Sequence, residues 1–481
     1  MAPLPGEKLK TIILVVLVLT SLVLTYLVWY GMPPYEETEV VFQESFFFEE
    51  PKEKVETIKP EQILIPLEEE QKVILNQQQE EYEQIWTEIK PLLEENLSEE
   101  EQVGSDQLPE DDACLMVEFD PPFPIEIEHI PYLAGLNQLM RLEFYFASET
   151  FIRLEGEEEF QYELPEDDFV ELQEMVAEFE DSDFPRYELL ELEADNDENE
   201  DIEDLDLDLD IEDPEEIELE IIQDIYLPVE ELEMYNYIDL MREDLALEEL
   251  LQAVFVNHKL ARQIEEPDGT LIFTDGEKGL RVSKYLEYTA PKLEGSAATH
   301  SYDGAIQEAN EFLCYYGGWP DGLYLDAISR TDETGIPGGE GYFNARWRYY
   351  HQGYPVVGNL GETEVKFNDR GLYFYQRTLF APGDSTGEKK NISWNKKVLS
   401  RALEFYVEQN IEEFINEDNE SAGIFRLEDI YLAYHLEDFI ENNMARAYPV
   451  WVVEIEGEVI YLDVSELNPF WRGEEDEYIE S

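Results

Sequence analysis

A single uncharged, apolar run near the start of the chain limits what this protein can be. Residues 11–30 contain no charged side chain across 20 positions. At about 1.5 Å per residue, a helix of this length measures about 30 Å, the thickness of the hydrocarbon core of a bilayer. A signal peptide has a shorter apolar core, about 7–15 residues long, and a small-residue cleavage site, whereas this run is followed by GMPPY. The run therefore predicts an uncleaved transmembrane helix over residues 11–30.

The charges on the two sides of this run predict its orientation. Residues 1–10 carry Lys8 and Lys10 against Glu7, and the far side opens with acidic residues from Glu36 onward. Positively charged flanks stay in the cytoplasm. We therefore expect a single-pass protein of the cell membrane, with a cytoplasmic tail at residues 1–10 and the bulk of the chain outside the cell.

The remainder of the chain is long enough to form a folded ectodomain. The chain has 481 residues and is 43% hydrophobic, so an ectodomain of about 450 residues can bury cores and divide into two or three domains. The 116 acidic and 31 basic residues give a net charge of −85, which excludes a general affinity for nucleic acid or anionic lipid. We interpret the acidity as a hydrated surface adapted to high external salt, where screening weakens self-repulsion.

The fold class predicted for the ectodomain is α+β. Its first part, residues 31–265, begins with a membrane-proximal stalk and contains an acidic tract. The expected strands lie near residues 63–65, 114–130, 140–155 and 205–211, and the expected amphipathic helices lie at 69–97, 167–180 and 229–261.

The composition changes near residue 265, where the density of acidic residues falls and Gly and Tyr become frequent. Two blocks follow, each an amphipathic helix and then a meander of strands, which predict C-terminal α+β modules at residues 266–385 and 386–467 before an acidic tail at 468–481. Ser301 and Ser393 are placed as N-caps of the two helices, and Glu456-Gly457 as a tight hairpin turn.

The sequence carries no motif for catalysis, a cofactor or a metal. None of the five histidines has a second His or Cys at metal-ligand spacing, and HExxH and GxSxG do not occur. The stretch GIPGGEGYFNARW lacks the Lys-Ser or Lys-Thr of a phosphate loop and is interpreted as a hairpin loop. We expect no catalytic, cofactor-binding or metal-binding residues.

Two weaker patterns leave alternatives open. Oxygen-bearing residues at 195, 197, 199 and 201 resemble the start of a calcium loop, but Glu200 stands where such a loop needs Gly and Asp206 is twelfth instead of Glu. Loose condensation of cations on many carboxylates is the alternative. Cys114 and Cys314 face an oxidising compartment and could form a bridge, or they could be two small buried side chains.

Several segments together resemble one known family. They are KLKTIILVVLVLTSLVLTYLVWY at the start, VETIKPEQILIP in the first ectodomain segment, FTDGEKGLRVSKYLEYTAP before the modules, and YYHQGYPVVGN and YPVWVVEIEGEVIYLD within them. In layout and in these segments the chain resembles the YycH family of membrane-anchored regulators. It departs from the family in its acidity and in the tract DNDENEDIEDLDLDLD.

The resemblance implies a non-enzymatic regulator of the WalK/WalR (YycG/YycF) two-component system, which governs cell-wall metabolism. It implies two partners, the sensor histidine kinase and a YycI-like companion, reached largely through transmembrane helices. Within residues 11–30, a stripe with spacings of four and three is formed by Leu14, Val18, Ser21, Thr25 and Val28. Small hydroxyl residues in mid-membrane allow close helix packing and interhelical hydrogen bonds, although they also bond to carbonyls of their own helix.

Two other functions stay open at this level. The protein could be an anchored ectodomain that binds a wall polymer or a secreted protein. It could also be a wall hydrolase with carboxylate catalysis, since 116 acidic residues supply many accidental pairs.

Overall fold

The computed structural model describes residues 48, 50–67, 71–94, 113–124, 138–146, 150–156, 159–164, 169–180, 182–190, 218–292, 301–320, 322–331, 342–358, 362–383, 387–410, 424–441 and 444–469. Their secondary structure is mixed α+β and rich in strands, which confirms the expected fold class. The expected transmembrane helix at 11–30 lies outside this part of the chain. Inside it, no helix is both long and apolar enough to cross a membrane.

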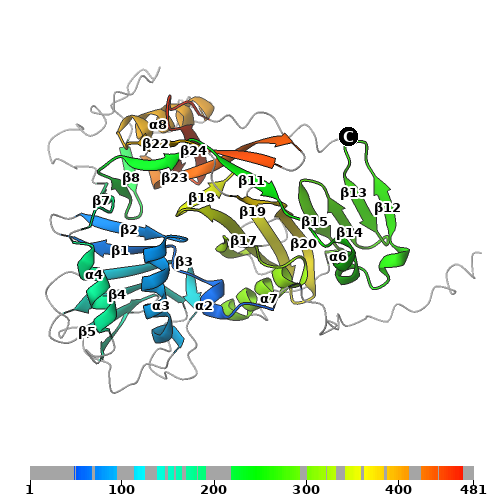
Figure 1. The fold of residues 1–481 in the computed structure, drawn as a ribbon, viewed down its shortest axis with the longest axis horizontal. Helices are drawn as coiled ribbons and strands as arrows, with labels where there is room; N and C mark the ends of the chain where they lie inside the picture. The colour runs from blue at the N-terminus through cyan, green and yellow to red at the C-terminus, as the bar shows by residue number, and fades with distance from the viewer. Residues whose placement is uncertain are drawn as a thin grey trace, which may run out of the picture. The chain divides into compact units, whose positions relative to one another are not determined.

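The first sheet is antiparallel and lies within the N-terminal half of the chain (Figure 1). In the described residues its strand order is β6-β5-β4-β3-β1-β2-β7-β9. The strands are β1 (Gln62–Pro66), β2 (Lys72–Asn76), β3 (Leu115–Pro124), β4 (Gln138–Phe146), β5 (Thr150–Glu155), β6 (Glu159–Leu164), β7 (Arg186–Leu189) and β9 (Tyr226–Pro228). The predicted strand at 63–65 and the predicted strand pair at 140–155 are confirmed.

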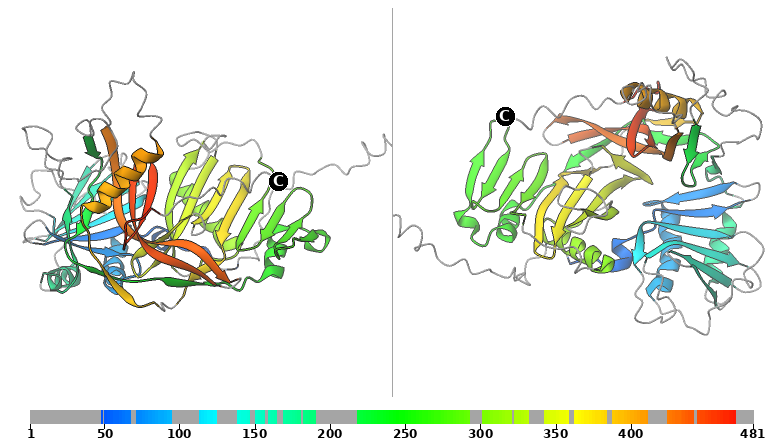
Figure 2. Two further views of the ribbon diagram at one scale, coloured as in Figure 1. Left: turned by 90° about the horizontal axis from the view of Figure 1, so that it is seen from above. Right: turned by 180° about the vertical axis from the view of Figure 1, so that it is seen from behind.

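Two helices, α3 (Glu80–Glu94) and α4 (Val170–Glu178), lie on one face of this sheet (Figures 1 and 2), and the short α2 (Lys54–Thr57) precedes it. The buried side chains of α3 recur at helical spacing, as predicted: Tyr82, Ile85, Trp86 and Ile89. The start of the predicted helix at 69–97 is wrong, because residues 72–76 form β2 instead. That apolar run pairs with β1 and ends at a turn with Gln78 at φ 71, so the helix begins only after the turn.

The second sheet contains strands from the rest of the chain. Among the described residues its main path is β12-β13-β14-β15-β20-β19-β17-β18-β23-β24-β11-β21, with β16, β25 and β8 paired to β17, β24 and β23. The strands are β8 (Glu218–Ile221), β11 (Ile238–Arg242), β12 (Arg262–Glu265), β13 (Leu271–Thr274), β14 (Gly279–Val282), β15 (Tyr285–Thr289), β16 (Leu323–Thr331), β17 (Tyr342–His351), β18 (Tyr354–Val357), β19 (Glu362–Asn368), β20 (Gly371–Thr378), β21 (Phe380–Pro382), β23 (Ile424–Glu441), β24 (Met444–Ile455) and β25 (Glu458–Asp463).

Each of the two predicted modules contains its expected helix and meander. Helix α7 (Tyr302–Tyr315) packs on β17 and β19, and α8 (Lys397–Gln409) packs on β24 and β25. The modules are joined into one sheet, because β18 at the end of the β17–β18 hairpin pairs in parallel with β23. The two predicted meanders are therefore parts of one continuous sheet.

The local predictions for these modules differ in outcome. Ser301 caps α7, accepting a hydrogen bond from the Gly304 backbone nitrogen at 3.1 Å. Ser393 is not a cap, since α8 begins at Lys397 and its amide bonds to the Asn395 side chain at 3.0 Å. The hairpin turn at 456–457 is confirmed, with positive φ at both residues.

The predicted helix at 229–261 is wrong over its first half. This region forms β10 (Leu232–Tyr235) and β11, followed by α6 (Leu247–Val254) and the 3₁₀ helix η7 (His258–Leu260). Burial alternates along both strands, with Leu232, Met234, Ile238 and Leu240 inside. The partner of β10 is β22 (Lys389–Ile392), and β11 pairs with β24 and β21. The chain has therefore left the first sheet by residue 232, whereas the amino-acid composition changes only near residue 265.

Candidate functional site

The residues singled out from the sequence are only partly within the described structure. The stripe Leu14, Val18, Ser21, Thr25 and Val28 lies outside it, and so does the calcium-like segment at 195–206. Of the two cysteines, Cys114 lies partly exposed just before β3 and Cys314 is buried in α7, and no disulfide joins them. Cys314 is therefore a small buried side chain, as one of the two alternatives proposed, whereas Cys114 is not fully buried.

A group of carboxylates gathers where the first sheet meets the second. Glu61 directly precedes β1 and Asp120 lies in β3, while Asp326 lies in β16, Asp429 in β23 and Glu454 in β24. Strands β3 and β16 are in contact, and the charges of these five groups influence one another. We call these five residues the carboxylate junction.

Irregular strand pairing places two of these side chains. Asp326 is the extra residue of a β-bulge in β16, because pairing steps from Leu325 to Ala327. A bulge bends its strand and changes the direction of a side chain. A second bulge in β23, before Asp429, brings this residue directly opposite Glu454. Two acidic residues therefore form a cross-strand pair, an arrangement that costs stability when both are ionised.

The pKa values of four junction carboxylates, Glu61, Asp120, Asp429 and Glu454, are raised. Desolvation by the surrounding protein is the main cause at Glu61, and the charges of Asp120 and Asp429 add to it. Desolvation also raises the pKa of Asp120 and of Glu454. For Asp429, burial raises the pKa to about 7, with a further contribution from Glu454. Glu61 and Asp120 nevertheless keep exposed surface, so protons and small ions can reach the group.

Two guanidinium groups of β17, Arg346 and Arg348, partly balance this negative charge, and both oppose the rise in the pKa of Asp120. Arg348 of β17 lies 3.2 Å from an Asp326 carboxylate oxygen and 3.7 Å from one of Glu362. Burial opposes the charge on Arg348, but these carboxylates outweigh it and raise its pKa. Tyr431 donates a hydrogen bond to Glu454 at 3.1 Å. The junction thus has more acidic groups than basic partners.

Further contacts connect the two sheets beside the junction. Lys59, just before β1, forms a 2.8 Å ion pair with Glu83 of α3 and lies 5.3 Å above the ring of Tyr324 in β16. The backbone nitrogen of Gln352 in the β17–β18 turn donates to the Gln78 side chain at 3.2 Å. A change of protonation at the junction therefore takes place where the two sheets are in contact.

Because four of its pKa values are raised, the junction changes its charge as the pH changes. Within the described ranges, no group of three or more His, Cys, Asp or Glu side chains has metal-binding geometry.

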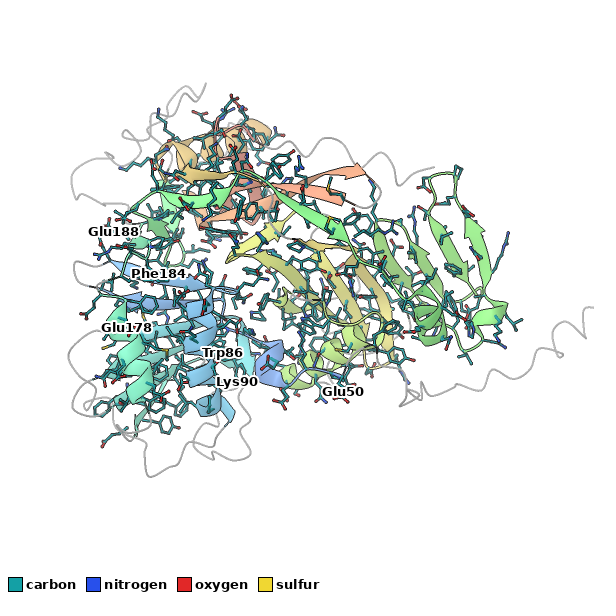
Figure 3. All side chains as sticks on the ribbon, in the orientation of Figure 1. Glu50, Trp86, Lys90, Glu178, Phe184 and Glu188 are labelled. Atoms are coloured by element: carbon teal, nitrogen blue, oxygen red, sulfur yellow. The ribbon has the colours of Figure 1, made fainter. Side chains whose placement is uncertain are left out.

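A separate groove between α3 and α4 is lined by six glutamates, Glu80, Glu83, Glu88, Glu171, Glu174 and Glu178. Figure 3 labels Glu178 of α4 and Lys90 of α3, the two helices that border this groove.

The carboxylate junction has no signal in the sequence. Its members are scattered from residue 61 to residue 454 among 116 acidic residues. Only strand pairing and two bulges bring them together, and neither has a local signal in the sequence.

Comparisons with known proteins identify the family. The family described as YycH protein, N-terminal domain matches residues 7–127, and YycH protein, C-terminal domain matches residues 222–466. The fold is similar to that of the crystal structure of YycH from Bacillus subtilis, with a TM-score of 0.53 and 13% identity, covering 85% of this chain and 97% of that one.

Two other comparisons add little. A crystal structure of an uncharacterized protein from Eubacterium rectale ATCC 33656 is similar with a TM-score of 0.33 and 12% identity, over 53% of this chain and 91% of that one. No curated protein matches the chain.

The family matches cover both ends of the ectodomain, and they show that this chain belongs to the YycH family, whose members are regulators of the WalK/YycG system rather than enzymes.

Proposed function

We propose that this protein is a single-pass membrane regulator that acts on a WalK-like sensor histidine kinase together with a YycI-like companion. The observation that carries the proposal is the match to both YycH domains, the first of which includes the apolar run at 11–30. The N-terminus is cytoplasmic and the folded bulk is extracellular in this proposal, as the flanking charges predict.

The working surface inside the membrane is the stripe of Leu14, Val18, Ser21, Thr25 and Val28. At 100° per residue these positions fall on one face of a helix, so a partner helix can contact all five. Interhelical hydrogen bonds from the two hydroxyl residues contribute about 0.5–2 kcal/mol each. Such contacts shift the kinase between signalling states only if they differ in strength between those states.

A membrane pull-down combined with a kinase reporter tests the stripe. We expect the double variant Ser21→Leu/Thr25→Leu to lose the kinase or the companion and to change reporter output at unchanged protein level. The matched control is Thr20→Leu, which removes a hydroxyl about 120° away around the same helix. Equal association and output for the double variant and the native chain would refute the role of these two hydroxyl groups.

The competing function is an anchored ectodomain whose main work lies outside the membrane. Replacing residues 11–30 with an unrelated apolar helix separates the two proposals, because an inert anchor tolerates the exchange. The carboxylate junction supplies the residues for testing hydrolysis. Carboxylate-dependent release of material from purified wall, abolished by Glu454→Gln, would favour an enzyme over a regulator.

A further inference from the structure

The outer edge of β12 and the segment before it form a surface without a described partner. β12 is the first strand in the order of the second sheet and pairs only with β13 among the described strands (Figure 1). All four of its residues are exposed. An edge strand of this kind presents unpaired backbone groups that another strand can bind.

The strand register shows which backbone groups are available. The Glu266 amide bonds to the Thr270 carbonyl at 2.9 Å, across the β12–β13 hairpin. Because hydrogen-bonded pairs alternate along an antiparallel ladder, residues 262 and 264 also point toward β13. Gln263 and Glu265 therefore direct their N–H and C=O groups outward.

Three exposed apolar side chains lie in β12 and in the segment just before it. Val256 is 101% exposed, Leu260 is 77% exposed and Ile264 is 37% exposed, all within nine residues of chain. A short, charged edge strand is one way to prevent pairing, but that purpose does not require exposed apolar side chains. Solvent contact of three such groups in one segment is typical of an interaction surface.

The segment is held in place by the core behind it. Leu250 and Val254 of α6 and the following Phe255 are buried. The carbonyls of Ala253 and Val254 accept hydrogen bonds from Tyr315 at 3.3 Å and from Lys278 at 3.4 Å. The exposed residues are thus presented by an anchored turn, which lowers the entropy lost when a partner binds.

Charge indicates the chemistry of the partner. Residues 256–264 read VNHKLARQI, with Lys259 and Arg262 and no acidic residue, in a chain of net charge −85. Neither cation forms an ion pair with any residue that the structure describes. A second copy of the chain carries the same large negative charge, and long-range repulsion opposes its approach. An extended segment with alternating apolar and acidic side chains fits the edge, the apolar groups and the cations together.

We propose that the outer edge of β12, with Val256, Leu260 and Ile264, is the docking surface for an extended strand with alternating apolar and acidic side chains, which the proposed function assigns to the companion's ectodomain. The partner strand pairs with Gln263 and Glu265, places apolar side chains on Leu260 and Ile264, and places carboxylates against Lys259 and Arg262. This inference rests on the proposed function, since it assigns a surface to the ectodomain contact.

The test measures binding of the full-length chain, in detergent, to the purified ectodomain of the companion. Leu260→Asp removes an apolar contact and adds repulsion of an acidic partner. Gln263→Pro removes an outward N–H while leaving the β12–β13 ladder its bonds, and Gln263→Ala is its matched control. Val229→Asp is the control for charge on an exposed apolar residue elsewhere, since Val229 is 49% exposed.

We expect Leu260→Asp and Gln263→Pro each to weaken binding at least about tenfold, and both controls to change it less than about twofold. Melting curves equal to that of the native chain show that the variants are folded. Binding of both test variants within twofold of the native chain overturns the docking surface and leaves the proposed function standing. Failure of the native chain to bind overturns the ectodomain contact, while the membrane stripe is judged by its own reporter assay.

Two further measurements exclude other occupants. Sedimentation of the chain alone, with self-association lost in Leu260→Asp, would assign the surface to a second copy. Co-sedimentation with phosphatidylglycerol vesicles, reduced by the same variant, would assign it to lipid. Either result overturns the proposal.

Discussion

Replacing Asp429 with Asn is expected to stabilise the protein at neutral and alkaline pH. Asp429 stands opposite Glu454 in the β23–β24 pair and next to the other junction carboxylates. Its Oδ1 accepts a hydrogen bond from the Ile430 amide at 2.7 Å, and the oxygen of Asn can accept the same bond. The substitution therefore removes the charge while keeping shape and acceptor.

The expected size follows from the pKa. Burial raises the pKa of Asp429 to about 7, against about 3.9 in an unfolded chain. Between these pH values the folded chain keeps a proton that the unfolded chain has released, so the free energy of unfolding falls as pH rises from about 4 to about 7. At about 1.36 kcal/mol per pH unit, the largest loss is about 4 kcal/mol. Because Glu454 shares this proton binding, we expect Asp429→Asn to recover about half of it.

The assay is the melting temperature followed by tryptophan fluorescence, from about pH 4 to about pH 9 at one high salt concentration. The variant should melt above the native chain at pH 8 and should show a flatter pH profile. The matched control is Asp183→Asn, which removes the same charge from an exposed position. A variant that melts at or below the native temperature at pH 8, or that keeps the native pH profile, would refute the assignment of ionised Asp429 as a destabilising group.

Three other changes test separate features. Arg377→Met should lower the free energy of unfolding by about 3–5 kcal/mol. The buried guanidinium pairs with Glu243 and donates to the carbonyls of Gly317 and Gly318 at 3.2 and 3.0 Å. Unfolding in denaturant measures the loss, and a loss below about 1 kcal/mol would contradict the role of this contact. Ser301→Ala should cost about 1 kcal/mol through loss of the α7 cap, measured by the same unfolding curve, whereas Ser301→Asp should restore the cap. Raising salt from low to molar concentration should raise the melting temperature, and a flat response would argue against adaptation to high salt.

The sequence alone determined the local features of this protein. The apolar run at 11–30 predicts a membrane span from its length, although the described residues do not test it. The α7 cap at Ser301, the apolar stripe of α3 and the turn at 456–457 were predicted and are present. Each depends on residues within a few positions of one another, so periodicity and turn chemistry suffice to find it.

Only the tertiary structure decided the contacts between distant segments. β11 pairs with β24 about two hundred residues downstream, and β18 joins the two modules through β23. The helix predicted at 229–261 was wrong over its first half, because apolar spacing in a short segment does not reveal a partner strand far along the chain. The bulge at Asp326 and the cross-strand pair of Asp429 and Glu454 also arise from pairing register, which no local pattern encodes. The family could therefore be recognised from segments of sequence, whereas the carboxylate junction and the free edge of β12 required the fold.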